Sequence, residues 1–314
     1  MPIKIGYLTR ILALLVVLGA VAGVDAARNP ARALGVLQCS FTVTNVAFGS
    51  VDVLTGAAYS SSATLTISCT GVSILPTNVY ACVTFPTPRA MTGPMSPTLQ
   101  YDLLGPPPLM TSWSNTTAIV IPTSGSILGF NANATVSVPA TLLANQQSTP
   151  AGSYSQTVNA TMNYSTSSCT SGLIVGTNSS SFQVSANVVK SCNVAATNLN
   201  FGTAGILNAA VNGQTEIDVQ CSNGTGYSIG LNGGLTGATD PTQRKMAFGA
   251  KTVTYGLYQD AAHASPWGSA SSTNEVAATG TSVSQPFQVY GYISIQPTPP
   301  PGTYSDTIIV SVTY

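Results

Sequence analysis

The side chains that could carry out acid–base or nucleophilic chemistry are few and scattered. The sequence contains one histidine, His263. Across residues 33–180 the only charged residues are Asp52, Arg89 and Asp102. Nucleophilic catalysis needs a base beside the nucleophile, and carboxylate catalysis needs a second carboxylate at a set distance. We therefore expect no enzymatic activity, no metal site and no cofactor.

The composition excludes further functions and indicates the fold class. The 314 residues carry 9 Lys and Arg against 9 Asp and Glu, so no basic face is available for nucleic acid. Ser, Thr, Asn, Gly and Val are abundant, and Pro and Gly recur between short apolar segments. Such a composition predicts an all-β protein with many turns.

The first 26 residues have the pattern of an export signal. Lys4 and Arg10 precede an apolar run over residues 11–24, and Val24-Asp25-Ala26 ends in a small residue. The run is shorter than the roughly 20 residues that cross a bilayer, although a retained membrane anchor is the alternative. We therefore expect export and exclude residues 1–26 from the fold.

The cysteines give the remaining chemistry of the chain. An even number of cysteines in an exported chain predicts disulfides. The sequence contains six, which allow fifteen connectivities: Cys39, Cys69, Cys82, Cys169, Cys192 and Cys221.

An internal repeat organises the elements that carry these residues. Several anchors recur in one order, which indicates two homologous domains, 27–180 and 181–314. The recurring segments are Cys39-Ser-Phe-Thr-Val-Thr-Asn-Val-Ala-Phe-Gly49 with Cys192-Asn-Val-Ala-Ala-Thr-Asn-Leu-Asn-Phe-Gly202, Arg89-Ala-Met91 with Arg244-Lys-Met246, Tyr101-Asp-Leu with Tyr255-Gly-Leu, Trp113 with Trp267, and Ala151-Gly-Ser-Tyr-Ser-Gln-Thr-Val-Asn-Ala-Thr-Met-Asn-Tyr164 with Pro301-Gly-Thr-Tyr-Ser-Asp-Thr-Ile-Ile-Val-Ser-Val-Thr-Tyr314.

The repeat also predicts strands and disulfides. Alternating segments such as Thr64-Leu-Thr-Ile-Ser-Cys69 and Glu216-Ile-Asp-Val-Gln-Cys221 are typical of half-buried strands, so each domain suits one β-sandwich. The equivalent pairs Cys39–Cys69 and Cys192–Cys221 are then expected to form one bond per domain. Cys82 and Cys169 have no counterparts in the second copy and most simply pair with each other. The shared Trp113 and Trp267, like Arg89 and Arg244, are expected to be structural.

This ordered set of motifs resembles the spore coat protein U domain family over nearly the whole chain after residue 26. Two such domains with the extra Cys82 and Cys169 resemble the tip subunit of archaic, Csu-type chaperone–usher pili. The resemblance implies two tandem immunoglobulin-like, pilin-type sandwiches. It also implies assembly by donor-strand exchange: each pilin fold lacks one strand, which a periplasmic chaperone supplies first and a neighbouring pilin supplies afterwards.

The segment 181–189 is a candidate donor strand into the first domain. Phe182, Val184, Ala186 and Val188 alternate with polar residues, as a strand added to a sheet edge requires. By contrast, the segment before Cys39 contains Pro30, Gly35 and two arginines, which makes it a poor donor and favours a tip position. The alternating segment that ends at Tyr314 predicts that the second domain takes a strand from the next pilin.

Three apolar loops of the first domain are candidate surface-binding loops. The second domain has the polar segment Gln259-Asp-Ala-Ala-His-Ala-Ser-Pro266 where the first has an apolar, proline-stiffened one. If the loops gather at one end they form an uncharged apolar surface; otherwise they pack into the core of the first domain or onto the second domain. The candidates are Leu103, Leu104, Pro106, Pro107, Pro108, Leu109 and Met110, then Ile74 and Leu75, then Ile127 and Leu128.

The sequence therefore predicts an exported pilus tip adhesin that supports surface attachment and biofilm formation. Its expected partners are a periplasmic pilus chaperone, an outer-membrane usher, the adjacent pilin and abiotic or hydrophobic surfaces. Its expected location is the cell surface, at the pilus tip. The alternatives are a carbohydrate-binding tip lectin and a structural pilin or coat subunit without an adhesive role.

Overall fold

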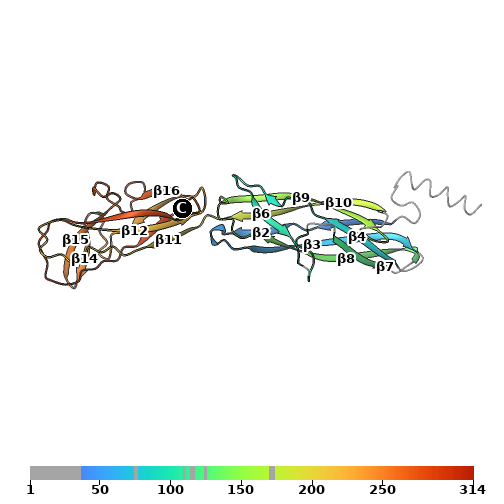
Figure 1. Cartoon of the computed structure of the whole chain (residues 1–314), viewed down its shortest axis with the longest axis horizontal. Helices are drawn as coiled ribbons and strands as arrows, with labels where there is room; N and C mark the ends of the chain where they lie inside the picture. The colour runs from blue at the N-terminus through green and yellow to red at the C-terminus, as the bar shows by residue number, and fades with distance from the viewer. Residues whose placement is uncertain (1–36, 74–76, 109, 114–116, 124–125, 170–173) are drawn as a thin grey trace, which may run out of the picture.

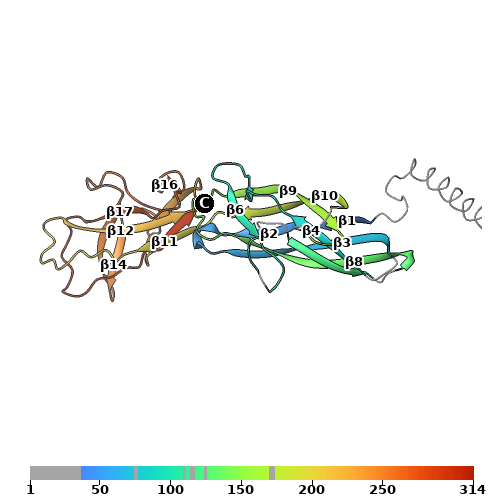
Figure 2. The same ribbon diagram turned by 45° about the vertical axis from the view of Figure 1, so that its right-hand side comes forward.

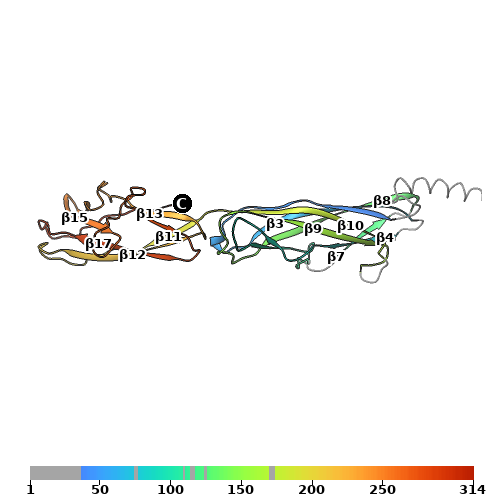
Figure 3. The same cartoon turned by 90° about the horizontal axis from the view of Figure 1, so that it is seen from above.

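Two β-domains lie end to end in an elongated molecule, as Figure 1, Figure 2 and Figure 3 show from three directions. The computed structural model describes residues 37–73, 77–108, 110–113, 117–123, 126–169 and 174–314. The expected export signal lies outside these residues. Among the described residues, no helix has the length and apolarity needed to span a membrane.

The first domain is a sandwich of two five-stranded sheets with strand orders β1-β3-β8-β6-β5 and β2-β10-β9-β4-β7. Its strands are β1 (Gln38–Val43), β2 (Val46–Val51), β3 (Tyr59–Ser73), β4 (Thr77–Thr84), β5 (Ala90–Met91), β6 (Leu99–Leu103), β7 (Thr117–Thr123), β8 (Ser126–Leu142), β9 (Gly152–Ser165) and β10 (Gly176–Val188). A short 3-10 helix, η2 (Val53–Thr55), follows β2. Alternate residues of these strands face one core between the sheets.

The second domain repeats only part of this architecture. One sheet has five strands in the order β11-β12-β17-β15-β14, and the other has three in the order β16-β13-β18. The strands are β11 (Cys192–Ala196), β12 (Val211–Cys221), β13 (Gly226–Leu231), β14 (Arg244–Phe248), β15 (Lys251–Tyr258), β16 (Val276–Thr279), β17 (Gln285–Ile293) and β18 (Val310–Thr313). The all-β, two-sandwich prediction is confirmed.

The residues shared by the repeats build the same core in both domains. Trp113 and Trp267 are each 1% exposed, and each indole N–H donates to a backbone carbonyl. Arg89 donates to the carbonyls of Leu103 and Trp113 and pairs with Asp102. Arg244 is fully buried among backbone carbonyls, and this burial lowers its pKa. The prediction that these residues are structural is confirmed.

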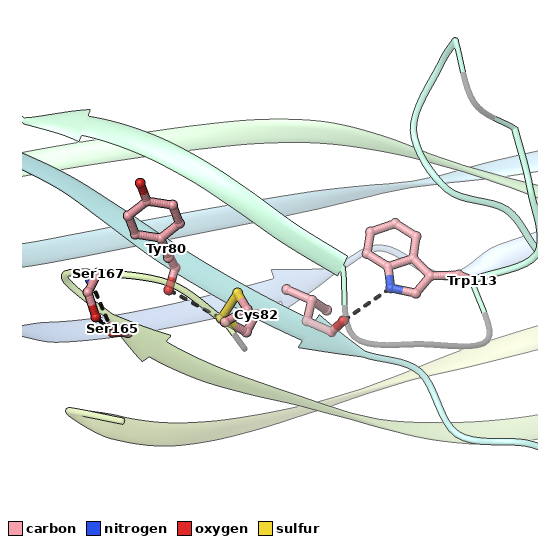
Figure 4. The surroundings of a disulfide bond; sticks show 7 residues. Tyr80, Cys82, Trp113, Ser165 and Ser167 are labelled. Atoms are coloured by element: carbon pink, nitrogen blue, oxygen red, sulfur yellow. Dashed lines mark hydrogen bonds between the residues drawn. A yellow bond between two sulfur atoms is a disulfide. The ribbon is translucent and has the colours of Figure 1, made fainter. Parts of the chain in front are cut away.

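Three disulfides brace the sandwiches, with the pairings predicted from the repeat. Cys39–Cys69 joins β1 to β3, and Cys192–Cys221 joins β11 to β12. Cys82–Cys169 ties β4 to the segment that follows β9. Figure 4 shows Cys82 on β4. The carbonyl of the next residue, Val83, accepts the hydrogen bond from the indole N–H of Trp113. The third disulfide therefore attaches the segment between β9 and β10 to the body of the first domain.

The junction between the domains is short and hydrogen-bonded on both sides. The N–H of Val189 donates to the carbonyl of Val51 over 3.0 Å, and the hydroxyl of Ser191 donates to the carboxylate of Asp52 over 2.8 Å. Ser191 also exchanges backbone and side-chain hydrogen bonds with Ser222 of the second domain. Residues 189–191 thus connect the two domains through fixed contacts.

Two further hydrogen bonds cross the junction away from the connecting residues. The side-chain amide of Asn223 donates to the carbonyl of Ser148 over 2.8 Å, and the hydroxyl of Ser282 donates to the carbonyl of Gln147 over 2.6 Å. The end of the first domain that carries Asp52 and the 147–148 loop is therefore the face on which the second domain rests.

Candidate functional site

Strand β10 completes the second sheet of the first domain. It pairs antiparallel with β9 along its full length and parallel with β2 through Val184, Ser185, Asn187 and Val188. The strand begins at Gly176, five residues before the segment that the alternation indicated. Residues 181–188 of the predicted segment 181–189 therefore lie in the sheet of the first domain.

The core of the first domain receives the four alternating residues of this strand. Phe182, Val184, Ala186 and Val188 are all buried and belong to its apolar cluster. The ring of Phe182 lies edge-on to that of Phe85, with centroids 5.7 Å apart. The strand is anchored further by Asn45, whose side-chain oxygen accepts the backbone N–H of Gln183 over 2.8 Å. The side chains of β10 pack into the core, and its backbone hydrogen bonds hold it in the sheet.

Among residues 174–314 the second domain contains no counterpart of β2 or of β10. Its three-stranded sheet corresponds to β7, β4 and β9 of the first domain, with β18 in the position of β9. Within residues 174–314, all of which the structure describes, β18 pairs with β13 alone. The segment that matches β2, residues 199–204, forms no strand. A strand there would need the missing neighbour as its hydrogen-bond partner.

The apolar face of β18 is partly uncovered as a result. Ile308, Val310 and Val312 are half-buried, whereas their counterparts on β9, Val158, Ala160 and Met162, are at most 2% exposed.

The opposite wall of the same gap is uncovered too. On β11, Val194 is 47% exposed, whereas its counterpart Phe41 is 5% exposed. The residues of these two walls flank the place that β10 takes in the first domain, and we call this set of half-buried or exposed apolar residues the acceptor groove: Val194, Leu199, Phe201, Ile308, Val310 and Val312. The groove has the place and the apolar lining that β10 fills in the first domain.

Beside the acceptor groove, a buried tyrosine is retained in both repeats. Tyr101 donates to Gln156 over 2.7 Å, and Tyr255 donates to Asp306 over the same distance. Burial raises the pKa of Tyr101 to about 12, against the opposing effect of the Arg89 cation. Burial also raises the pKa of Tyr255, and the hydrogen bond to Asp306 adds to this effect. Both tyrosines are therefore neutral hydrogen-bond donors at any physiological pH.

The strand ends that flank two of the three candidate apolar loops lie together, at the end of the first domain away from the second. Ser73, the last residue of β3, pairs with Ser126, the first residue of β8. Ile74 and Leu75 follow β3 but lie outside the described residues. Ile127 and Leu128 belong to β8 by their backbone, and their side chains are outside what the structure describes. We call this end of the molecule the distal end.

The third loop lies on the flank of the domain. The N–H of Leu104 donates to the carbonyl of Pro139, which lies 13 residues from Ser126 along β8. At about 3.3 Å per residue, that separation is about 40 Å. The described part of the third loop therefore lies far from the strand ends at Ser73 and Ser126.

Within this flank loop, exposure varies from residue to residue. Leu103 is the last residue of β6 and is fully buried, so its expected role in surface binding is wrong: its side chain belongs to the core. Leu104 and Pro106 are partly buried, and Pro107 and Pro108 are exposed. Met110 is 46% exposed, and Leu109 lies outside the described residues.

The distal end contains apolar residues that sequence reasoning missed. Ile174 is 57% exposed and Val175 is 40% exposed; both precede β10 and lie at the same end as Val72, which is 46% exposed. The three charged residues in the described part of this domain lie elsewhere: Asp52 at the junction, and Asp102 and Arg89 beside β6. The apolar triplet Leu173-Ile-Val175, enclosed by glycines in a Ser- and Thr-rich stretch, was the available signal.

The single histidine packs against aromatic rings on the second domain. The centroid of the His263 ring is 4.6 Å from that of Tyr292 and 5.2 Å from that of Tyr258. The carboxylate of Asp260 holds its loop by accepting the backbone N–H groups of Ala264 and Ser265. The described residues contain no group of three His, Cys, Asp or Glu side chains placed to hold a metal ion. The contacts of His263 are those of a packed surface loop.

Comparison with known proteins identifies the family. A curated relative, Protein U of Myxococcus xanthus, is 33% identical over 128 residues, which are 37% of this chain and 71% of that protein. A chain in the crystal structure of a chaperone–tip adhesion subunit pre-assembly complex, from archaic chaperone–usher Csu pili of Acinetobacter baumannii, matches with a TM-score of 0.53 and 19% identity. The match covers 88% of this chain and 100% of that one, so the two share a fold.

The family model itself matches twice. The Spore Coat Protein U domain is found over residues 28–161 and again over residues 178–311. The chain therefore belongs to the Spore Coat Protein U domain family, with two copies of the domain in tandem.

Proposed function

We propose that the chain is the tip adhesin of a chaperone–usher pilus, exported to the cell surface and not an enzyme. In this proposal the second domain joins the pilus and the first contacts the surface to which the cell attaches. The observation that carries the proposal is the contrast between β9, covered by β10, and β18, whose equivalent face is open.

The acceptor groove is suited to an added strand from another subunit. Its walls are apolar, and the backbone of β18 presents an edge that is unpaired among residues 174–314. Backbone hydrogen bonds to that edge provide affinity, and apolar side chains at every second position provide fit. Asn198 occupies the position of Asn45, whose side chain accepts a backbone N–H of β10. A periplasmic chaperone fills this groove before assembly, and the adjacent pilin delivered by the usher fills it afterwards.

A tip position is supported by the distal end. Aligned on Cys221 and Cys69, the docking residue Asn223 corresponds to Gly71, and Gly224 corresponds to the exposed Val72. The distal end therefore lacks the amide with which the second domain rests on the first, and it carries an apolar side chain instead. An end without docking groups suits the free end of a fibre.

Attachment is assigned to the same end. Val72, Ile174 and Val175 are exposed at the distal end, which has no charged side chain among its described residues. Water leaves such a surface at little cost when it meets another apolar surface. The flank loop with Met110 is a secondary contact. Biofilm formation follows from attachment of this kind to abiotic surfaces.

The acceptor role is tested with a synthetic peptide of residues 176–188, the one strand known to complete this fold. Added to the purified full chain, whose first domain already contains that strand, the peptide is expected to raise the midpoint of the lower thermal transition. The control peptide carries Val184→Asp, which puts a charge into the groove. Equal midpoints with and without the first peptide would exclude an acceptor role for the second domain.

A further inference from the structure

The junction between the two domains of this chain shows how one domain of this family contacts the next. The first domain holds the second with two loops: the turn at residues 51–54, reached by Val189 and Ser191, and the 147–148 loop, reached from the body of the second domain. Strand β10 leaves the first domain between these loops. Strand exit and domain docking therefore share one end of the domain.

The second domain has the same two loops at its own far end. Aligned on Cys39 and Cys192 without a gap, residues 51–54 correspond to residues 204–207. The 147–148 loop corresponds to residues 297–298, which follow Gln296 as Gln147 follows Gln146.

A shared hydrogen-bond pair supports the second of these matches. The side chain of Gln146 bonds both the N–H and the carbonyl of Gln100. The side chain of Gln296 does the same with Thr254, the residue that corresponds to Gln100. The loop that receives the second domain is therefore reproduced, with its anchor, at the far end of that domain.

A strand in the acceptor groove would leave it at this end. In the first domain β10 runs antiparallel to β9 and exits beside Gly152. The residue that corresponds to Gly152 is Gly302, against which the ring of Phe248 packs at the far end. The body of a subunit that donates its strand must begin there, because its chain emerges there.

The docking end of the first domain and the far end of the second domain differ in the polarity of one loop position, and this difference bears on which side chain a partner would present. Asp52, which accepts the hydroxyl of Ser191, corresponds to Gly205, so the carboxylate contact is absent at the far end. The next residue, Ile206, is 74% exposed, whereas its counterpart Val53 is 4% exposed. Ile295 is 68% exposed and adjoins the same pair of loops. The far end therefore has exposed apolar side chains where the first junction has a polar contact.

We propose that residues 204–207 and 295–298 form a docking face for the body of the subunit whose strand fills the acceptor groove. The occupant is a domain of the same family, and it meets Ile206 with an apolar side chain. The proposal rests on the proposed function, because it takes the donor strand to come from an adjacent pilin. It adds a second contact, outside the groove, that aligns the next subunit with this one.

The test places a photo-crosslinking amino acid at one position at a time in the full chain, assembled into fibres on cells. Position 312 reports the groove, position 206 reports the docking face, and position 174, also an exposed isoleucine, is the matched control at the opposite end. After irradiation, adducts are identified by mass spectrometry. We expect the adjacent pilin to be attached at 312 and 206 with comparable yield, and not at 174.

Each other outcome has a definite meaning. An adduct with the pilin at 312 but none at 206 overturns the docking face and leaves the proposed function intact. An adduct at 206 with a protein other than the one captured at 312 also overturns it. No adduct with a pilin at 312 overturns the proposed function, and the docking face with it.

Discussion

Met162 and Val312 occupy equivalent positions in the two repeats, but only Met162 is buried. Both residues face inward from a strand in the same place in the fold. Met162 lies under β10, which pairs with β9 along its whole length, and Val312 has no such cover among residues 174–314. The difference between the two side chains marks the place of β10, which has no counterpart among residues 174–314.

Val312→Asp is expected to prevent stable joining of the chain to the pilus. A charge buried without a partner costs about 3–5 kcal/mol, which corresponds to a loss of more than about a hundredfold in stability of the complex. The control is Thr313→Asp, on the outward face of β18. Gel electrophoresis without heating measures the subunit complex. An equal loss of the subunit complex in both variants would argue against strand binding in the acceptor groove.

Phe182→Ala is expected to destabilise the first domain by about 3–5 kcal/mol, because it leaves a cavity beside Phe85. Urea unfolding of the full chain measures the change through the transition of the first domain. Gln183→Ala, on the exposed face of the same strand, is expected to change stability by less than about 0.5 kcal/mol. Similar losses of stability from the two substitutions would mean that the inward side chains of β10 do not stabilise the core of the first domain.

Ile174→Ser with Val175→Ser is expected to reduce attachment of piliated cells to polystyrene without reducing the number of pili. The substitutions remove exposed apolar surface at the distal end and disturb no buried contact of these two side chains. Met110→Ser, on the flank loop, is expected to have a smaller effect. Unchanged attachment by both variants would favour a structural subunit, and inhibition by a soluble sugar would favour a lectin.

Alkaline pH is expected to weaken the first domain through Tyr101. Its pKa is raised to about 12 in the folded state by burial, compared with about 10 in an unfolded chain. Above pH 10 the unfolded state releases this proton and the folded state keeps it, so stability falls between pH 10 and 12. Denaturant midpoints across this range should fall more steeply for the wild-type chain than for Tyr101→Phe. Parallel curves would exclude this linkage.

The alternation and the repeat predicted most of the architecture, since periodicity in strands and repeated anchors are local properties of the sequence. The disulfide pairs followed from the same repeat. Leu103 was misassigned because the composition of a loop does not show where its strand ends: the residue pairs with Ala140 and points into the core. The separation of the apolar loops depends on sheet register, which joins Ser73 to Ser126 and places Leu104 beside Pro139. No local pattern encodes those pairings.

Strand β10 also determines how the molecule bears mechanical load. In the proposed function, attachment at the distal end and a pull through the second domain would apply tension along the axis of β10, which leads directly into residues 189–191. The hydrogen bonds that hold β10 to β9 and β2 lie across that axis. Tension held at Ile174 and Val175 would run along the backbone of β10 itself, whereas tension held on another strand, as at Val72 on β3, would shear these bonds together. In the proposed function, the strand that completes the first domain would also be the segment through which the pilus pulls on it.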